Sequence, residues 1–202
     1  MPLSAESATV GRAAGLRRRR GLPGAAACSN VFVRGNGNRT ERKRAMARIA
    51  VIIPAAGKGE RFGGNEKKTF AKVEGQAVFL RSIQHFLQRE DVCQTILAVA
   101  PEDQEEMKSK YAANLGFMGV KLVVGGAQRF ETVAKALEIV VEEAEYVAVH
   151  DAVRCCVSTD MIDRVFAEAQ KTGAAILAAP LVGTIKRVGE AKVVDATVPR
   201  EG

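Results

Sequence analysis

Apolar residues recur with two different periods from residue 48 onward, and the pattern predicts an α/β fold. Short continuous apolar runs are typical of strands buried on both faces. They predict strands at 49–53, 95–100, 120–124, 146–150 and 174–179. Between the strands, apolar residues follow helical spacing at 78–87, 102–115, 131–143 and 159–171. Strand–helix alternation of this kind predicts a doubly wound, mainly parallel sheet with helices on both faces.

The pattern changes after Pro180. Residues 184–188 and 192–196 flank Gly189-Glu190-Ala191, which predicts a β-hairpin with a three-residue turn. Its mixed polarity predicts an arm, at about 181–200, that projects from the body of the domain. Because a doubly wound domain rarely ends on an uncovered hairpin, we also expect the domain at 47–202 to be incomplete at its C-terminal end.

Residues 1–46 have no apolar period and contain the run Arg17 to Arg20, so they are predicted to form a disordered basic tail. Three interpretations remain open for this tail. These interpretations are a transit peptide, a nucleic-acid-binding segment, and sequence upstream of a true first residue at Met46. The last is favoured because the ordered pattern begins two residues after Met46.

The net charge of +7 belongs to this tail. The first 49 residues hold 11 Arg or Lys and 2 Asp or Glu, whereas the remainder holds 19 and 21. No nucleic-acid surface is therefore expected on the folded domain. No apolar run reaches the roughly 18 residues of a membrane span, so no membrane association is expected either. The adjacent Cys155 and Cys156 suit neither a zinc site nor an ordinary disulfide, and they predict reduced thiols in a reducing compartment.

The strongest chemical signal runs from Pro54 to Phe62, at the carboxyl end of the first strand, and is followed by Lys67-Lys68. Open α/β sheets bind ligands at this end of their strands. Small residues let the backbone approach a nucleotide, and loop N–H groups can cradle phosphate. Neither a P-loop nor a dinucleotide fingerprint has this spacing. The candidate residues here are Ala55, Ala56, Gly57, Gly59, Arg61 and Lys68.

Two further loops follow later strands. Asp151 ends the fourth strand within His150 to Arg154, where a carboxylate can hold Mg²⁺ or orient an acceptor, although such an Asp is also a common helix cap. His150 is interpreted as structural, since neighbouring strand residues point to opposite faces. Gly125-Gly126, followed by Thr132, offers backbone groups to a base or ribose, and a simple turn is an equal alternative.

Together these loops resemble the nucleotide-diphosphosugar transferase superfamily, and within it the 2-C-methyl-D-erythritol 4-phosphate cytidylyltransferases. The resemblance covers residues 48–202 and rests on P-A-A-G-K-G-E-R-F, G-G-x-x-R, H-D-A-V-R, and A-A-P with T-I-K-R, all in family order. It implies a Rossmann-like nucleotidyltransferase fold with a β-arm. Three departures are visible: Lys67-Lys68-Thr69 stands where the family usually has Pro-Lys-Gln, Cys155 stands where Pro is usual, and the family continues beyond residue 202.

The resemblance also implies roles for individual residues. Arg61 and Lys68 fall on groups that stabilise charge on the α-phosphate, and Arg200 on the arginine that positions the acceptor phosphate. Ala55, Ala56, Gly57, Gly59, Gly126 and Thr132 fall on the nucleotide-binding loops, together with Ala152. Asp151 falls on the residue that faces acceptor and metal, with Arg154 beside it. Thr184 and Lys186 fall on the acceptor-binding part of the arm.

The implied activity is transfer of a cytidylyl group from CTP to a polyol phosphate, with Mg²⁺ as cofactor and a homodimer formed through the arms. The alternatives are a ribitol 5-phosphate cytidylyltransferase and an inactive nucleotide-binding fragment. The expected location is the cytoplasm, or the plastid if the tail is a transit peptide.

Overall fold

The computed structural model describes residues 32–35, 47–57, 67–179 and 182–199. These residues divide into two compact units, a body that ends at Leu177 and a smaller unit that begins at Ala178.

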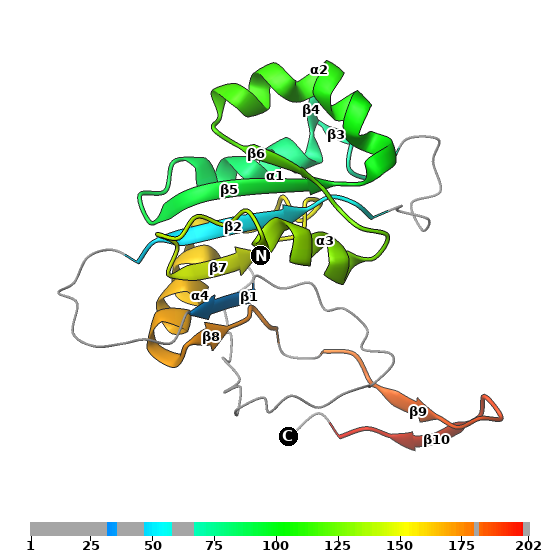
Figure 1. The fold of residues 1–202 in the computed structure, drawn as a ribbon. Coiled ribbons are helices and arrows are strands. Elements are labelled where there is room, and N and C mark those ends of the chain that lie inside the picture. Colours follow the sequence, from blue (N-terminus) through cyan, green and yellow to red (C-terminus); the bar gives the residue numbers. More distant parts are fainter. Residues whose placement is uncertain (1–31, 36–46, 58–66, 180–181, 200–202) are drawn as a thin grey trace. The chain divides into compact units, whose positions relative to one another are not determined.

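A six-stranded sheet forms the centre of the body (Figure 1). Its strands, in spatial order, are β6 (Lys121–Val124), β5 (Val92–Val99), β2 (Ile49–Pro54), β7 (Tyr146–Val149), β1 (Phe32–Gly35) and β8 (Ala174–Ala175). The run from β6 to β7 is parallel throughout. β1 is antiparallel to both of its neighbours. The prediction of a mainly parallel sheet is therefore confirmed.

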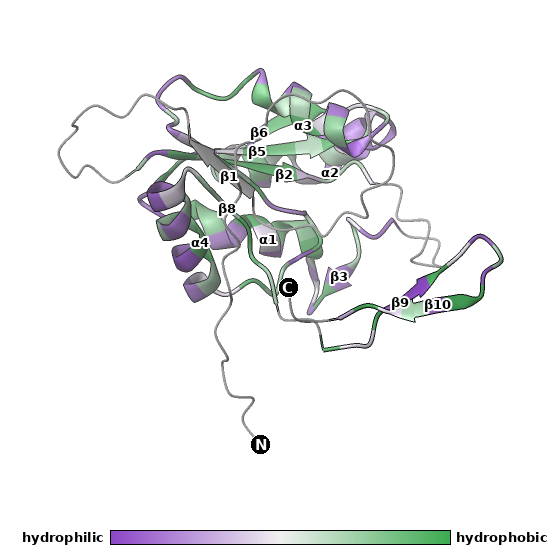
Figure 2. Ribbon diagram, turned by 90° about the horizontal axis from the view of Figure 1, so that it is seen from below, coloured by the Kyte–Doolittle hydropathy of each residue, from purple (hydrophilic) through white to green (hydrophobic). Residues whose placement is uncertain are grey.

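Helices cover both faces of the sheet because β2 is apolar on both faces. Ile49, Val51 and Ile53 are fully buried in one core cluster with residues of α1, α2 and α4. Ile52 belongs to a second cluster that includes Ala136 of α3. The helices are α1 (Val78–Leu87), α2 (Gln104–Phe117, preceded by the 3₁₀ turn η2, Pro101–Asp103), α3 (Arg129–Leu137) and α4 (Thr159–Thr172). Figure 2 shows the apolar strands β2 and β5, whereas α4 carries hydrophilic residues on its outer side.

Local sequence signals set several of the helix ends. The Ser158 hydroxyl accepts a hydrogen bond from the Met161 N–H and caps α4, which ends at Gly173 with a φ of 88°. α3 ends at Leu137, six residues earlier than predicted. The Gln94 side chain of β5 donates to the Ile139 carbonyl at 2.9 Å and accepts from the Val141 N–H at 3.0 Å. These bonds hold the chain away from helical geometry.

The structure corrects the prediction of a wholly disordered tail at residues 32–35, which form β1. This strand pairs with β7 and β8, so its partners lie more than 100 residues away along the chain. The rest of the tail lies outside the described residues. A short hairpin of β3 (Lys72–Val73) and β4 (Gln76–Ala77) was also not predicted. Its turn uses positive φ angles at Glu74 and Gly75, the geometry of tight hairpins.

The second unit contains the predicted hairpin, formed by β9 (Lys186–Val188) and β10 (Val194–Thr197). The turn between them is longer than predicted and includes a hydrogen bond from the Gly189 N–H to the Val193 carbonyl at 3.2 Å. Val188 and Val194 are cross-strand partners, and both side chains are exposed. That the hairpin projects as an arm stays a prediction. Among the helices of the described ranges, none has both the length and the apolar character of a membrane span.

Candidate functional site

The predicted site residues of the body that the structure describes follow the carboxyl ends of β2, β6 and β7. β5 and β6 lie on one side of β2, whereas β7 lies on its other side, so the strand order reverses at β2. Open α/β sheets bind ligands at such a switch point. Backbone hydrogen bonds continue past the strand ends. The Ala55 N–H donates to the Ala98 carbonyl at 2.7 Å, and the Ala152 N–H donates to the Pro54 carbonyl at 3.4 Å. The loops that follow β2 and β7 therefore run side by side.

The loop after β2 begins with a buried Ala55, continues through the half-buried Ala56 and reaches the exposed Gly57. Gly59 and Arg61, both predicted site residues, lie outside the described residues. Lys68 follows them, and its side chain is exposed, with no hydrogen bond or ion pair within the described ranges. The buried Thr69 hydroxyl lies 3.4 Å from the Ala55 carbonyl, which places Lys68 near the end of β2.

Asp151 joins the loop after β7 to the turn after β6. Its carboxylate accepts a hydrogen bond from Arg129 Nη2 at 2.8 Å and one from Arg154 Nε at 3.3 Å, and its side chain is 16% exposed. Arg154 was predicted, whereas no role was given to Arg129. The available signal was an arginine in the first turn of a helix that starts at the ligand-binding edge. The result is a carboxylate flanked by two guanidinium groups.

The Gly-Gly turn after β6 is held tightly against the start of α3. A Cβ atom on Gly126 would lie 2.4 Å from the Glu131 Cβ, so a side chain does not fit there. The fully buried Thr132 hydroxyl accepts from the Gly126 N–H at 3.1 Å and lies 3.1 Å from the Gln128 carbonyl. The Glu131 carboxylate accepts from the N–H groups of Ala127 and Gln128.

These contacts change what the turn can offer to a ligand. The N–H groups that were expected to bind a base or ribose are bonded within the turn itself. What remains is a small surface that a ligand can approach closely. The Gly125 carbonyl is also engaged, since it accepts a hydrogen bond from Lys135 Nζ at 2.9 Å. The Thr132 hydroxyl holds the turn in its conformation through its contacts with Gly126 and Gln128. A direct contact of Thr132 with a nucleotide stays a prediction.

Buried polar groups support the loop after β7 from below. His150 is 2% exposed, its ring packs on Phe86 with the ring centres 5.2 Å apart, and its Nε2 lies 3.1 Å from the Arg154 carbonyl. Burial lowers the pKa of His150 to about 4, so the ring is neutral at pH 7. The Ser82 hydroxyl donates to the carbonyl of Ala152, itself buried, at 2.7 Å. The interpretation of His150 as structural is confirmed.

The two adjacent thiols lie next to this loop and are not bonded to each other, with 4.0 Å between their sulfur atoms. Burial and the hydrogen bond with Cys156 raise the pKa of the Cys155 thiol. Cys155 is therefore a protonated thiol at neutral pH and a poor nucleophile.

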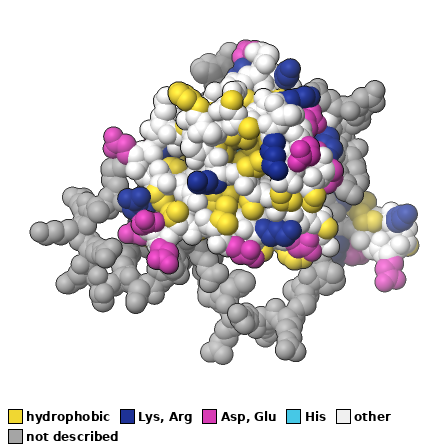
Figure 3. All heavy atoms as spheres, turned by 45° about the horizontal axis from the view of Figure 1, so that its top comes forward, with side chains coloured by type: hydrophobic (Ala, Val, Ile, Leu, Met, Phe, Trp, Pro, Cys, Tyr) yellow, Lys and Arg dark blue, Asp and Glu magenta, His cyan; other side chains and the backbone are white. Residues whose placement is uncertain are grey.

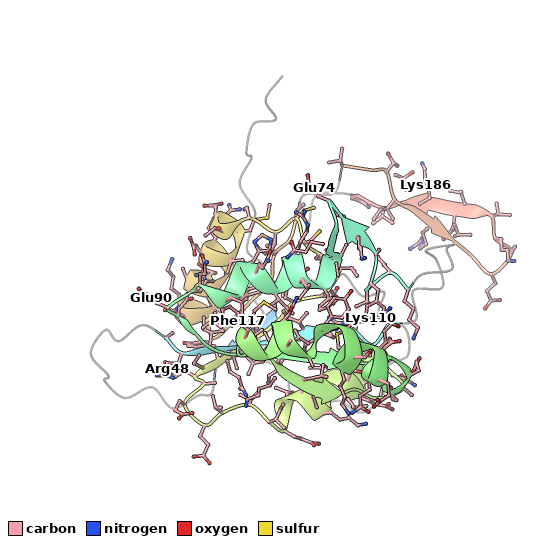
Figure 4. All side chains as sticks on the ribbon, turned by 90° about the horizontal axis from the view of Figure 1, so that it is seen from above. Arg48, Glu74, Glu90, Lys110, Phe117 and Lys186 are labelled. Atoms are coloured by element: carbon pink, nitrogen blue, oxygen red, sulfur yellow. The ribbon has the colours of Figure 1, made fainter. Side chains whose placement is uncertain are left out.

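The remaining predicted residues belong to the second unit. Lys186 lies on the hairpin (Figure 4), where its Nζ donates to the Thr197 hydroxyl at 2.6 Å. Thr184 is exposed. Arg200 lies outside the described residues. A contribution of Thr184 and Lys186 to the site at β2 and β7 stays a prediction.

No group of three or more His, Cys, Asp and Glu side chains within the described ranges could enclose a metal ion. Asp151 supplies a carboxylate at the strand ends, from the position predicted to hold Mg²⁺. Mg²⁺ is commonly bound by one or two carboxylates together with substrate phosphates, so a single carboxylate fits an ion that arrives with a triphosphate. Both arginine contacts to Asp151 would compete with the ion.

A separate hollow lies between α1 and α2, which run side by side in Figure 4. Its volume is about 360 Å³, and its lining is formed by Gln76, Leu80, Gln84, Ala113, Asn114, Phe117 and Met118. None of the predicted site residues is among them, and no charged side chain is present in this lining to meet a phosphate. Figure 3 shows hydrophobic side chains at the surface on the side that carries α2, with Lys and Arg side chains scattered among them.

A doubly wound sheet with small-residue loops and cationic side chains at its switch point is the architecture of an α/β nucleotide-binding protein. The family model described as IspD, 2-C-methyl-D-erythritol 4-phosphate cytidylyltransferase, matches residues 49–202. The chain belongs to this family.

Relatives of the chain carry the same description. The 2-C-methyl-D-erythritol 4-phosphate cytidylyltransferase of Rhodopirellula baltica is 43% identical over 152 residues, which cover 70% of this chain and 63% of that protein. The protein of the same name from Solibacter usitatus is 38% identical, covering 76% and 67%. The crystal structure of the Thermus thermophilus enzyme is 28% identical with a TM-score of 0.58, covering 76% and 64%. The chain thus spans about two thirds of the length of these relatives.

Proposed function

We propose that the chain transfers a cytidylyl group from CTP to 2-C-methyl-D-erythritol 4-phosphate, releasing pyrophosphate and forming CDP-methylerythritol for isoprenoid precursor synthesis. One observation carries the proposal: the exposed Lys68 and the Arg129–Asp151–Arg154 cluster come from loops that follow β2, β6 and β7 at one switch point. The names of the relatives supply the substrates.

The reaction proposed is an in-line displacement. The acceptor's phosphate oxygen attacks the α-phosphorus of CTP, a P–O bond forms, and the bond to the β-phosphate oxygen breaks. Such chemistry depends mainly on the placement of the reactants and on compensation of negative charge. Lys68 suits this role because its ammonium group is exposed and has no partner within the described ranges. Arg61 is predicted to act beside it.

The nucleotide is proposed to lie against the surface made by Ala55, Ala56 and Gly57, with the turn at Gly126 on one side and Ala152 on the other. Gly59 and Thr132 complete this predicted set. The acceptor is proposed to bind near Asp151 and Arg154, and Thr184, Lys186 and Arg200 of the hairpin unit are proposed to reach its phosphate. The flanking arginines hold the Asp151 carboxylate in a fixed orientation.

Mg²⁺ is proposed as the cofactor, with Asp151 as its protein ligand. A bound Mg²⁺ would neutralise charge on the triphosphate. The Asp151 oxygens already accept hydrogen bonds from Arg129 and Arg154, so the ion would compete with these two guanidinium groups for the carboxylate. Arg129 could then turn its guanidinium group towards a phosphate.

The test is pyrophosphate release from CTP and Mg²⁺ with 2-C-methyl-D-erythritol 4-phosphate, with ribitol 5-phosphate in parallel. Release with the first acceptor alone is the expected outcome, and release with ribitol 5-phosphate alone would identify the sister activity. CTP binding without turnover would support the alternative of a nucleotide-binding role.

A homodimer formed through the hairpin is also proposed. Isolated two-stranded hairpins are marginally stable in water, and Val188 and Val194 leave apolar surface exposed on this one. A second copy of the chain would cover that surface. The location stays a prediction, either the cytoplasm or, if the basic tail is a transit peptide, the plastid.

A further inference from the structure

Lys67 and Lys68 are neighbours in sequence, but of the two only the Lys67 side chain contacts carboxylates within the described ranges. The Lys67 ammonium group forms an ion pair with the Asp103 carboxylate and lies 3.7 Å from the Glu102 carboxylate. Asp103 lies in η2, and its side chain is only 7% exposed. A carboxylate this deeply buried needs a partner, because an unpaired buried charge is costly. Lys67 is that partner.

The residue after Lys68 is anchored as firmly as the residue before it. Thr69 is 5% exposed, with its hydroxyl 3.4 Å from the Ala55 carbonyl. Phe70 is buried and stacks on Tyr111 with ring centres 6.1 Å apart. Within the turn, the Phe70 N–H donates to the Lys67 carbonyl at 2.9 Å and the Ala71 N–H to the Lys68 carbonyl at 3.3 Å. The Lys68 backbone is thus held on both sides, while its side chain remains exposed.

We propose that Lys67 and Asp103 are positioning residues, whose ion pair fixes the turn so that Lys68 presents its ammonium group to a phosphate of CTP. This inference rests on the proposed function of the same site. The two carboxylates also cancel the charge of Lys67, so the lysine pair offers one available cation rather than two that repel each other. Lys67 therefore acts through its neighbour and not on the nucleotide.

The competing role for Lys67 is that of a second phosphate ligand, which would have to leave Asp103 when CTP binds. The two roles differ in how they couple to Lys68. If Lys67 only positions Lys68, replacing Lys67 does not weaken CTP binding further in a chain that already lacks the Lys68 side chain. If Lys67 binds phosphate itself, the two losses add, because the contacts are then independent.

The experiment is a double-mutant cycle on the full chain. CTP binding in the presence of Mg²⁺ is measured by calorimetry, and pyrophosphate release is measured alongside. The variants are Lys67→Met, Asp103→Asn, Lys68→Ala and Lys67→Met combined with Lys68→Ala. The control is Lys108→Met, which removes an exposed ion pair with Glu105 on α2, 3.5 Å long. Thermal unfolding of each variant checks that it is folded.

The expected result is that Lys67→Met and Asp103→Asn each weaken CTP binding about 10- to 100-fold, the range for a small misplacement of a binding group. In the Lys68→Ala background, Lys67→Met adds less than about twofold. The control stays near wild type. The charge-swapped variant K67D/D103K keeps the ion pair and regains most of the lost affinity, which loss of folding alone would not explain.

Two results would overturn the inference while the proposed function stands. One is a Lys67→Met variant that binds CTP like wild type when Lys68→Ala does not. The other is an equal loss from Lys67→Met in both backgrounds, which would make Lys67 a direct ligand. A wild-type chain that binds no CTP would instead overturn the proposed function, and a Lys68→Ala variant that both binds CTP and releases pyrophosphate like wild type would overturn the role given to Lys68; the inference falls with either result.

Discussion

At the scale of single residues, Lys68 and His150 are set apart by their surroundings. Lys68 is exposed at the carboxyl end of β2, where its charge can meet a ligand, whereas His150 is buried beneath the same edge and uncharged at pH 7. A cation in the first environment serves binding or catalysis, and a neutral ring in the second serves packing. Each assignment leads to a measurable consequence.

Lys68→Ala is expected to lower the rate of pyrophosphate release by about 10²–10³-fold, by analogy with the loss of one group that stabilises transition-state charge. The matched control is Lys121→Ala. Lys121 is exposed at the amino end of β6, on the opposite edge of the sheet, so its loss should leave turnover near wild type. Unchanged turnover in a folded Lys68→Ala protein would remove Lys68 from the mechanism.

His150 is expected to make the stability of the body depend on pH. Its pKa is about 4 in the folded chain and about 6.5 when unfolded, so the unfolded chain binds the extra proton between these values. The contribution of His150 is complete above pH 6.5 and is lost as the pH falls towards 4, by about 3 kcal/mol in total. Urea unfolding of wild type and His150→Gln across this range measures it, since only the difference between the two curves belongs to His150. Parallel curves would contradict the burial of a neutral ring.

The residues that sequence reasoning missed at the site are those whose partners lie far away in the chain. The Asp151 and Arg154 pair could be foreseen because three positions separate them. Arg129 contacts Asp151 across 22 positions, and Lys67 contacts Asp103 across 36. Only the packing of α3 and η2 beside the strand ends brings these groups together, and no local pattern encodes that packing.

At the scale of elements, the sequence pattern predicted the helices and strands whose formation depends on residues close together in the chain. The helix at 78–87 has the predicted bounds because its apolar face is complete within ten residues. The strand at 49–53 was predicted because it is apolar on both faces. β1 was missed, since four residues beside an arginine-rich stretch show no period, and the strand exists only through pairing with β7 and β8. The shorter α3 likewise depends on Gln94, a side chain from another element.

The glycines provide a test of the turn that precedes α3. Gly126→Ala would place a Cβ 2.4 Å from Glu131, so we expect a loss of about 1–3 kcal/mol from overpacking. Gly116→Ala is the matched control, because Gly116 lies within α2 with no atom within 4 Å of an added Cβ. That change should stabilise the protein by about 0.5–1 kcal/mol, since alanine is the better helix former. Denaturant unfolding measures both, and equal effects would show that the turn is not tightly packed.

At the scale of the whole molecule, the hairpin unit is expected to make the chain a dimer. Val188 and Val194 face the same side of the hairpin as cross-strand partners, so the double change V188K/V194K places two charges on the surface proposed to be covered. We expect light scattering after size exclusion to give a dimer for wild type and a monomer for this variant. Glu190→Lys in the hairpin turn controls for added charge alone. A wild-type monomer at micromolar concentration would contradict the proposal.

Because β1 lies upstream of Met46, the residue at which translation starts decides whether the protein contains this strand. β1 lies between β7 and β8, and in the described sheet it is the only partner of β8. A polypeptide translated from Met46 would lack β1, leaving the N–H and C=O groups along one side of β7 without their strand partner. Open edges of this kind recruit strands from other chains. A chain that begins at Met46 would therefore have an edge of β7 open to strands of other chains, even though every predicted site residue would still be present.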